Sequence, residues 1–172
     1  DARHKKVRVR YQIQRLAEPD TLSGSLAEHL KFGVSQHCDR PIVIIGAGPA
    51  GLFCAWRLLK QGHAVMVIDR GGDVRGRRPA LAQLNRDGLL DEENNYCFGE
   101  GGAGTFSDGK LYTRSTKKGS IRDVLEVFVA AGAPVQVLTD ARPHIGTNRL
   151  PKVVETFRNA MVDAGANFRF HT

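Results

Sequence analysis

The chain has 172 residues, of which 41% are hydrophobic and 25% are charged, and its formal net charge is +7. This length is sufficient for one hydrophobic core. No apolar run reaches the roughly 18 residues that a membrane-spanning helix needs, so the sequence predicts no membrane span. The aromatic residues are not interleaved with the basic runs and no nucleic-acid motif is present. We therefore expect a small-molecule substrate rather than nucleic acid as the partner.

Residues 1–38 differ in pattern from the rest of the chain. Hydrophobic and polar residues alternate from Val7 to Gln14, which predicts a strand with one polar face. Hydrophobic residues between Leu22 and Phe32 predict a short helix. We interpret residues 1–38 as the tail of a small β-containing domain with its linker, and residues 39–172 as a second, truncated domain. The chain starts without a methionine, and we expect it to be a piece of a longer protein.

The segment Pro41–Gly51 predicts a buried strand, a glycine turn and the start of a helix, the arrangement that binds a dinucleotide diphosphate. The apolar run Ile42–Ile45 is typical of a parallel strand that is covered on both faces. Gly46 permits the tight turn, Gly48 allows the backbone to approach a phosphate, and Gly51 lets the helix pack closely on the strand. The free N–H groups of the first helical turn would then face the anion.

Pro49 suits that first turn, and the expected helix extends to Gln61, with Gly62 as its stop. Its apolar stripe consists of Leu52, Ala55, Trp56 and Leu59. A second strand follows over His63–Ile68 and ends at Asp69. A carboxylate at this strand end can accept hydrogen bonds from both hydroxyls of an adenosine ribose, and it disfavours a 2′-phosphate.

The next segment, Arg70–Arg78, is rich in glycine and arginine, and it leaves the strand end that should hold the ligand. We expect it to close over the phosphates or the adenine, although a flexible basic loop is the alternative. A short helix is expected over Pro79–Leu90. Five glycines then fall within residues 99–109, which predicts a loop with many accessible backbone N–H groups. A plain surface loop is again the alternative.

Four elements are expected in the last third of the chain. They are a helix over Ser120–Ala131 with a capping box, a strand over Val135–Leu138, a helix over Leu150–Ala164 and a strand over 167–172. The last helix and strand predict a third parallel strand in the order 3-2-1. The fold class is therefore α/β, a Rossmann-like FAD/NAD(P)-binding βαβ domain.

The three cysteines, Cys38, Cys54 and Cys97, form no close pair. This spacing disfavours a metal site and a redox-active disulfide. Scattered unpaired cysteines suit a reducing compartment, so we expect a cytoplasmic protein. Cys54 falls within the first predicted helix and is expected in the core.

Three segments carry a resemblance to a known family: Val43–Leu52, Phe98–Leu111 and Pro143–Thr147. They resemble the uncharacterised FAD-dependent dehydrogenases, also described as NAD(FAD)-utilising dehydrogenases. The resemblance implies a longer flavoprotein with a glutathione-reductase-like FAD fold. It implies a cofactor site made of Gly46, Gly48, Pro49, Ala50, Gly51, Asp69, Arg70, Arg77, Gly101, Gly102, Ala103, Gly104, Thr105 and Lys110.

In that site the first glycine turn would hold the diphosphate and Asp69 the adenosine ribose. Arg77 would meet phosphate or adenine, and Gly101–Thr105 would border the flavin. The expected function is an FAD-dependent oxidoreductase, with NAD(P)H as a candidate electron donor. An NAD-binding dehydrogenase without flavin and a flavin-dependent RNA-modifying or RNA-binding protein are the alternatives. His144, Lys110 and Cys97 are candidates for chemistry, but no catalytic residue is identified.

Overall fold

The computed structural model describes residues 26–33, 40–111, 113 and 120–172. The strand expected within Val7–Gln14 lies outside these residues, as does the first part of the helix expected from Leu22. Residues 26–28 of that segment are helical.

Three parallel strands form the sheet: β1 (Ile42–Ile45), β2 (Val65–Asp69) and β3 (Asn167–Phe170). Their order is β1-β2-β3, which is the predicted 3-2-1 order counted from the other edge. Ile45 pairs with Ile68, so both strands end at the same edge of the sheet. The predicted Rossmann-like α/β fold is confirmed.

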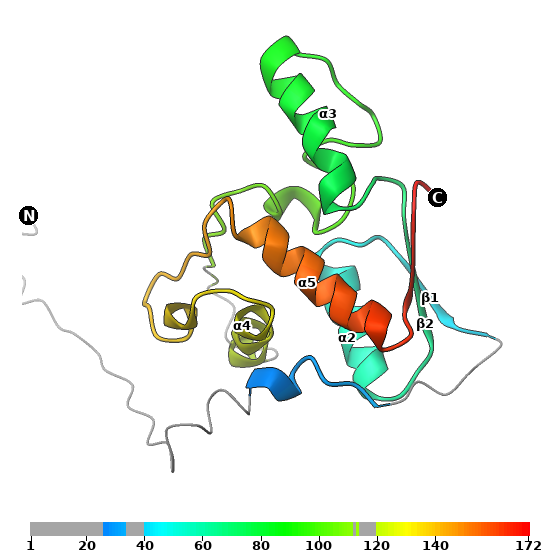
Figure 1. Cartoon of the computed structure of the whole chain (residues 1–172), viewed down its shortest axis with the longest axis vertical. Helices are drawn as coiled ribbons and strands as arrows, with labels where there is room; N and C mark the ends of the chain where they lie inside the picture. Colours follow the sequence, from blue (N-terminus) through cyan, green and yellow to red (C-terminus); the bar gives the residue numbers. More distant parts are fainter. Residues whose placement is uncertain (1–25, 34–39, 112, 114–119) are drawn as a thin grey trace, which may run out of the picture.

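Two helices, α2 (Pro49–Lys60) and α5 (Leu150–Asp163), lie side by side on one face of this sheet (Figure 1). Both predicted apolar stripes are buried, namely Leu52, Ala55, Trp56 and Leu59 on α2 and Val153, Val154, Phe157 and Met161 on α5. The rings of Phe53 and Phe157 join the helices, with centroids 5.2 Å apart. Cys54 is exposed, so its predicted place in the core is wrong: it lies outside the buried stripe of α2.

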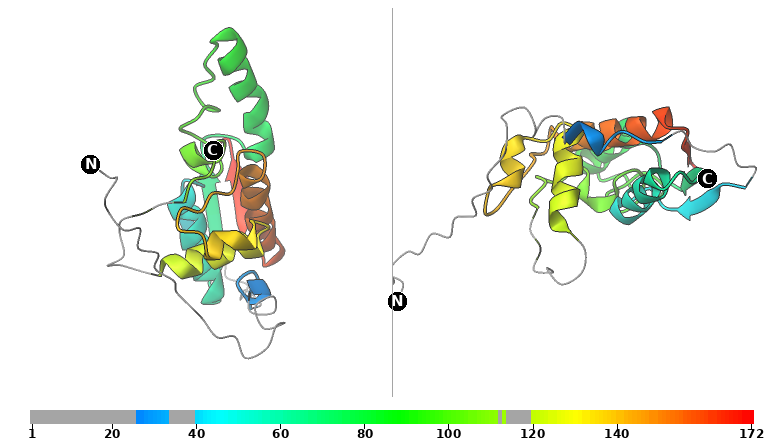
Figure 2. Two further views of the ribbon diagram at one scale, coloured as in Figure 1. Left: turned by 90° about the vertical axis from the view of Figure 1, so that its left-hand side faces the viewer. Right: turned by 90° about the horizontal axis from the view of Figure 1, so that it is seen from below.

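The remaining elements are α3 (Val74–Asp87), α4 (Ile121–Ala130) and the short 3₁₀ helices η2 (Gly102–Gly104) and η3 (Val135–Leu138). The left view of Figure 2 shows α3 projecting beyond the body formed by the sheet, α2, α4 and α5. Within the part of the chain that the structure describes, none of the helices combines the length and the apolar character that crossing a membrane demands.

The expected burial of the first strand on both faces is wrong. Ile42, Val43 and Ile45 are 41%, 53% and 85% exposed. The reason is position: β1 is at the edge of the described sheet and pairs with β2 alone. The apolar run therefore marks the strand correctly but not its surroundings.

The strand expected over Val135–Leu138 is also wrong, because these residues form the helix η3. Pro134 precedes it with φ −61°, and the N–H of Val137 donates to the Pro134 carbonyl at 3.0 Å. A tight turn of this kind satisfies the backbone locally where no partner strand is available. Val137 is buried and packs in the core as an apolar residue of the helix.

Helix α3 begins at Val74, five residues before the predicted Pro79. The Asp73 side chain caps its N-terminus by accepting from the Gly76 N–H at 2.7 Å. Residues 74–78 of the segment Arg70–Arg78, for which a flexible basic loop was the alternative, are therefore helical. The helix ends at Asp87, where Gly88 takes a left-handed φ of 69°.

Candidate dinucleotide site

A cleft of about 310 Å³ opens at the carboxyl ends of β1 and β2. In Rossmann-like sheets this edge is where nucleotide ligands bind. Its walls come from the first glycine turn, the end of β2, the second glycine-rich segment and the C-terminus. They consist of Ile45, Gly46, Gly48, Ile68, Asp69, Arg70, Cys97, Phe98, Gly99, Gly102 and Thr172.

The first glycine turn presents bare backbone to this cleft. A Cβ atom built on Gly46 or Gly48 would meet nothing within 4 Å, so no neighbouring side chain plugs the turn. Gly46 has φ +101°, which only glycine adopts readily. A Cβ on Gly51 would lie 1.9 Å from the Gly46 carbonyl oxygen, so this glycine permits the close contact between helix and turn. The three roles predicted for these glycines fit this geometry.

Helix α2 starts at this turn without a side-chain cap. By contrast, Asp73 caps α3 and Ser120 caps α4, as the sequence predicted for Ser120. The first N–H groups of a helix have no intrahelical acceptor. Those of Gly48 and Ala50 also lack a side-chain acceptor within the described ranges. With the positive end of the helix dipole, they suit an anion.

Asp69 joins the end of β2 to the glycine turn. Its Oδ2 accepts from the Ala47 N–H at 2.7 Å and its Oδ1 accepts from the Gly71 N–H at 2.8 Å. The residue is 8% exposed and lines the cleft. Each carboxylate oxygen has a second lone pair, so both can still accept a hydroxyl. The carboxylate is thus held in place and retains the capacity that the predicted ribose contact needs.

Arg70 and Phe98 form a flat layer at the wall of the cleft. The Arg70 guanidinium carbon lies 4.3 Å from the centre of the Phe98 ring. Glu93 accepts two hydrogen bonds from this guanidinium, at 2.6 and 2.7 Å. These bonds raise the pKa of Arg70 and lower the pKa of Glu93. The bidentate pair fixes the plane of the guanidinium, as stacking on a planar ring requires.

The second glycine-rich segment packs directly against the first turn. The N–H of Gly101 donates to the Ala47 carbonyl at 2.8 Å. A Cβ on Gly102 would come within 3.3 Å of Pro49 Cδ, so the two backbones meet at close range. Among the predicted residues of this segment, Gly102 lines the cleft. Gly102, Ala103 and Gly104 together form the 3₁₀ helix η2.

Arg77 lies behind this segment and is completely buried. Its guanidinium donates to the carbonyl oxygens of Asn95 at 2.8 Å, of Gly102 at 3.1 Å and of Glu100. Because no part of Arg77 is exposed, its side chain does not reach the cleft to make the predicted contact with phosphate or adenine. The residue holds the protein backbone instead, and burial lowers its pKa.

Glu100, like Arg77, is completely buried, and its role was not predicted from the sequence. Its Oε2 accepts from the Val74 N–H at 2.9 Å, and its Oε1 accepts from Arg158 at 2.7 Å. Burial raises the pKa of the Glu100 carboxyl, and both partners oppose that shift. Glu100 therefore ties the second glycine-rich segment to α3 and α5. The feature of the sequence that could have pointed to this role is the position of a single acidic residue among glycines.

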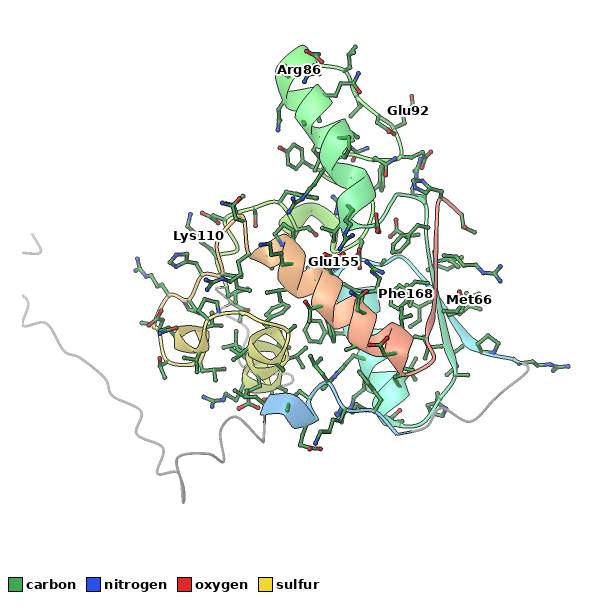
Figure 3. The ribbon with its side chains drawn as sticks, in the orientation of Figure 1. Met66, Arg86, Glu92, Lys110, Glu155 and Phe168 are labelled. Atoms are coloured by element: carbon green, nitrogen blue, oxygen red, sulfur yellow. The ribbon has the colours of Figure 1, made fainter. Side chains whose placement is uncertain are left out.

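The far end of the segment, around Lys110, lies away from the sheet. Figure 3 shows Lys110 on the opposite side of α5 from Met66 and Phe168. Lys110 forms an antiparallel bridge with His144, which brings two of the resembling segments together. Its Nζ pairs with Asp108 at 2.7 Å, which raises the pKa of Lys110 and lowers the pKa of Asp108.

Thr105, which was expected to border the flavin, and the nearby Ser107 both form hydrogen bonds within the loop itself. Thr105 Oγ1 donates to the Glu100 carbonyl at 3.0 Å, and Ser107 Oγ donates to the Gly104 carbonyl at 2.7 Å. Thr105 is 1% exposed, whereas Ser107 is exposed. In the described part of the chain, no group of His, Cys, Asp or Glu side chains is arranged to hold a metal ion.

A second, almost wholly apolar cavity of about 230 Å³ lies beside the cleft, beyond Gly101 and Pro49. Phe53, Phe128 and Phe157 supply part of its lining, and Thr105, Ser107 and Lys110 supply the polar residues. The cleft and this cavity thus lie on either side of the two glycine segments, with Asp69 and Gly102 lining the cleft and Gly101 and Lys110 lining the cavity.

Comparisons with known proteins agree with this geometry. Residues 44–96 match the family model described as an NAD(P)-binding Rossmann-like domain. A protein of Clostridium beijerinckii described as uncharacterized is 39% identical over 145 residues, which are 84% of this chain and 27% of that protein. The chain thus spans about a quarter of the length of this relative.

Two shorter matches have names that describe a reaction. An L-glutamate oxidase precursor of Streptomyces viridosporus is 46% identical over 46 residues, 26% of this chain and 7% of that protein. A flavin-containing monooxygenase FMO GS-OX-like 2 of Arabidopsis thaliana is 40% identical over 50 residues, 29% of this chain and 11% of that protein. The parallel sheet, the glycine turn and the matched residues together identify a Rossmann-like nucleotide-binding fold.

Proposed function

We propose that this chain is the FAD-binding part of a flavin-dependent oxidoreductase. One observation carries the proposal: an uncapped helix N-terminus and a side-chain-free glycine turn open on one cleft with a fixed carboxylate. The helix N-terminus and the bare turn offer backbone N–H groups that suit a diphosphate, and the carboxylate suits the two hydroxyls of a ribose. The residues present therefore fit the ADP half of a dinucleotide.

Each wall of the cleft then has a binding role. Gly48 and Ala50 would donate backbone N–H groups to the diphosphate, and Asp69 would accept from the ribose hydroxyls. The layer of Arg70 on Phe98 would stack against the adenine. This assignment uses groups that the fold already holds in place, so binding would require little ordering.

The second half of the dinucleotide would lie along the second glycine-rich segment. A Cβ on Gly104 would meet nothing within 4 Å, and Gly104 lines the apolar cavity, so there is open space for a flat ring beside the main chain at this residue. Lys110, kept protonated by Asp108, would supply a positive charge at the far end. A bound flavin supplies two-electron redox chemistry. The name of the flavin-containing monooxygenase match favours a flavin, and NAD(P)H is a candidate electron donor.

A second candidate is an NAD-binding dehydrogenase without flavin, which the description of the matched Rossmann-like domain favours. Equilibrium dialysis of the purified protein against FAD, FMN, NAD and ADP separates the two. The FAD proposal predicts uptake of FAD and ADP, much weaker uptake of NAD, and none of FMN, which lacks the ADP half. Preferential uptake of NAD would support the second candidate. Uptake of neither FAD nor ADP by a folded protein would contradict the site itself.

A further inference from the structure

We propose that Arg77 is a positioning residue for the diphosphate end of the cleft, acting on Gly48 through two peptide groups. The inference rests on the proposed function, since it concerns how the diphosphate site is held. Arg77 has no exposed surface, so it does not touch the ligand itself. Its effect passes through the backbone of the second glycine-rich segment.

The first step is the clamp on the Glu100–Gly101 peptide group. Arg77 donates from Nη1 to the Glu100 carbonyl, and Thr105 Oγ1 donates to the same oxygen at 3.0 Å. Arg77 also donates to the carbonyls of Gly102, Asn95 and Tyr96, so the guanidinium holds the backbone at four points. Three of these contacts, two on the Glu100 carbonyl and one on the Gly102 carbonyl, fall on the glycine-rich segment and restrict the backbone freedom that its glycines would otherwise allow.

The second step crosses to the first glycine turn. A trans peptide group is planar and holds its C=O and its N–H on opposite sides. Because the Glu100 carbonyl is fixed by Arg77, the Gly101 N–H is directed at Ala47, whose carbonyl accepts it at 2.8 Å. The Ala47 carbonyl belongs to the same peptide group as the Gly48 N–H. That N–H is therefore turned away from the second segment, and no group among the described residues accepts it.

The first turn is held from the other side as well. The N–H of Ala47 donates to Asp69 Oδ2 at 2.7 Å, so both peptide groups that flank Ala47 are fixed. Asp69 secures one of them directly, and Arg77 secures the other through Gly101. The Gly48 N–H would thus be oriented before a diphosphate arrives, which is the condition for an anion site that needs no rearrangement.

Arginine is required at this position for a geometric reason. Its planar fork reaches carbonyls in several directions at once, whereas a lysine ammonium is a point donor on a flexible stem. Arg77→Lys keeps the charge but cannot hold Asn95, Glu100 and Gly102 together. Arg75→Lys is the matched control, since Arg75 is on the same helix, is exposed and, among the described residues, pairs with Glu155 at 2.6 Å and does not line the cleft.

The experiment compares ADP with adenosine, which lacks the diphosphate. Calorimetric titration of the wild type, Arg77→Lys and Arg75→Lys gives the affinity for each ligand, and urea unfolding gives their stability. The proposal predicts that Arg77→Lys weakens ADP binding at least tenfold and leaves adenosine binding within twofold. Arg75→Lys leaves both unchanged. An equal loss of affinity for both ligands, or an unchanged affinity for ADP, would show that Arg77 has a structural role only and would overturn the proposal.

Amide hydrogen exchange in the wild type keeps the proposal testable should Arg77→Lys fail to fold. The Gly101 N–H should be protected without ligand, and the Gly48 N–H should become protected only when ADP is added. A Gly101 N–H that exchanges freely, or a Gly48 N–H unaffected by bound ADP, would refute the relay. Absence of ADP binding by the wild type would instead refute the proposed function.

Discussion

Asp69 Oδ2 accepts a hydrogen bond of 2.7 Å from the backbone N–H of Ala47, so the end of the second strand is tied to the glycine turn that follows the first. The two strands are neighbours, and the turn and the carboxylate therefore meet at one edge of the sheet. A diphosphate and a ribose are adjacent in every dinucleotide. The contact sets the spacing of the two groups that would bind them.

Replacing Gly48 by valine should weaken nucleotide binding strongly without unfolding the protein. Gly48 has φ −70°, which valine adopts, and a Cβ there would meet no protein atom within 4 Å. The added side chain would project into the space that the diphosphate needs. We expect ADP affinity to fall at least tenfold, while the free energy of unfolding changes by no more than about 0.5 kcal/mol.

Gly33→Val is the control for this variant, because a Cβ on Gly33 also meets nothing within 4 Å and Gly33 does not line the cleft. Calorimetry and urea unfolding measure both quantities. Normal ADP affinity in the folded Gly48→Val protein would exclude a diphosphate at this turn.

Gly51→Ala should instead act on stability. Its Cβ would lie 1.9 Å from the Gly46 carbonyl oxygen, so helix and turn must separate. We expect a loss of about 3 kcal/mol in the free energy of unfolding. Gly104→Ala, where a Cβ meets nothing within 4 Å, should cost nothing. Equal stabilities of the two variants in urea would mean that the close contact is absent in solution.

Asp69→Asn should weaken both the turn and the ligand site. An amide offers one acceptor oxygen where the carboxylate offers two, so either Ala47 or Gly71 loses its partner. The expected cost is about 1–3 kcal/mol of unfolding free energy. ADP affinity should fall together with it. Asp87→Asn is the control: Asp87 is exposed and, within the described ranges, pairs with Arg86, so this variant should have neither effect.

Phe98→Ala tests the adenine end of the cleft. Removing the ring leaves the Arg70 guanidinium without its stacking partner at 4.3 Å. We expect the preference for ADP over UDP to fall several-fold, because the flat layer favours the larger purine. Titration of wild type and variant with both nucleotides measures it. An unchanged preference would place the base elsewhere.

Glu100 predicts a pH dependence of stability. Burial raises the pKa of this carboxyl above its ordinary value of 4.5, so the folded state holds the proton more tightly than the unfolded state. Its contribution to stability is therefore full below pH 4.5 and is lost as pH rises through the raised pKa. Glu100→Gln removes this dependence.

The difference in unfolding free energy, variant minus wild type, should thus grow as pH rises from 4 toward 8. Urea unfolding of both proteins across this range measures it, and other titrating groups cancel in the difference. A difference that stays constant or shrinks with pH would contradict the raised pKa.

Local pattern was sufficient for much of the fold. The apolar stripes of α2 and α5, the Ser120 cap and the strand order follow from hydrophobic periodicity and capping chemistry, which act over a few residues. The prediction of a strand over Val135–Leu138 was wrong because a short apolar run does not reveal whether a partner strand exists. The prediction that β1 is buried on both faces was wrong for the same reason, since burial depends on what lies beside the strand.

The candidate site shows the same division. Gly46, Gly48 and Asp69 were predicted because each role is set by one residue and its neighbours. The backbone-binding role of Arg77 and the role of Glu100 were not predicted, because their partners are 18 or more residues away along the chain. An arginine among glycines suggests a ligand, and only the packing of α3 against the second segment reveals that it binds carbonyls.

A crystal structure of the protein with FAD would test the central claim most directly. The account predicts the diphosphate within hydrogen-bonding distance of the N–H groups of Gly48 and Ala50, and the adenosine ribose hydroxyls on Asp69. A diphosphate bound away from this turn, or a cofactor whose ribose lies apart from Asp69, would contradict it.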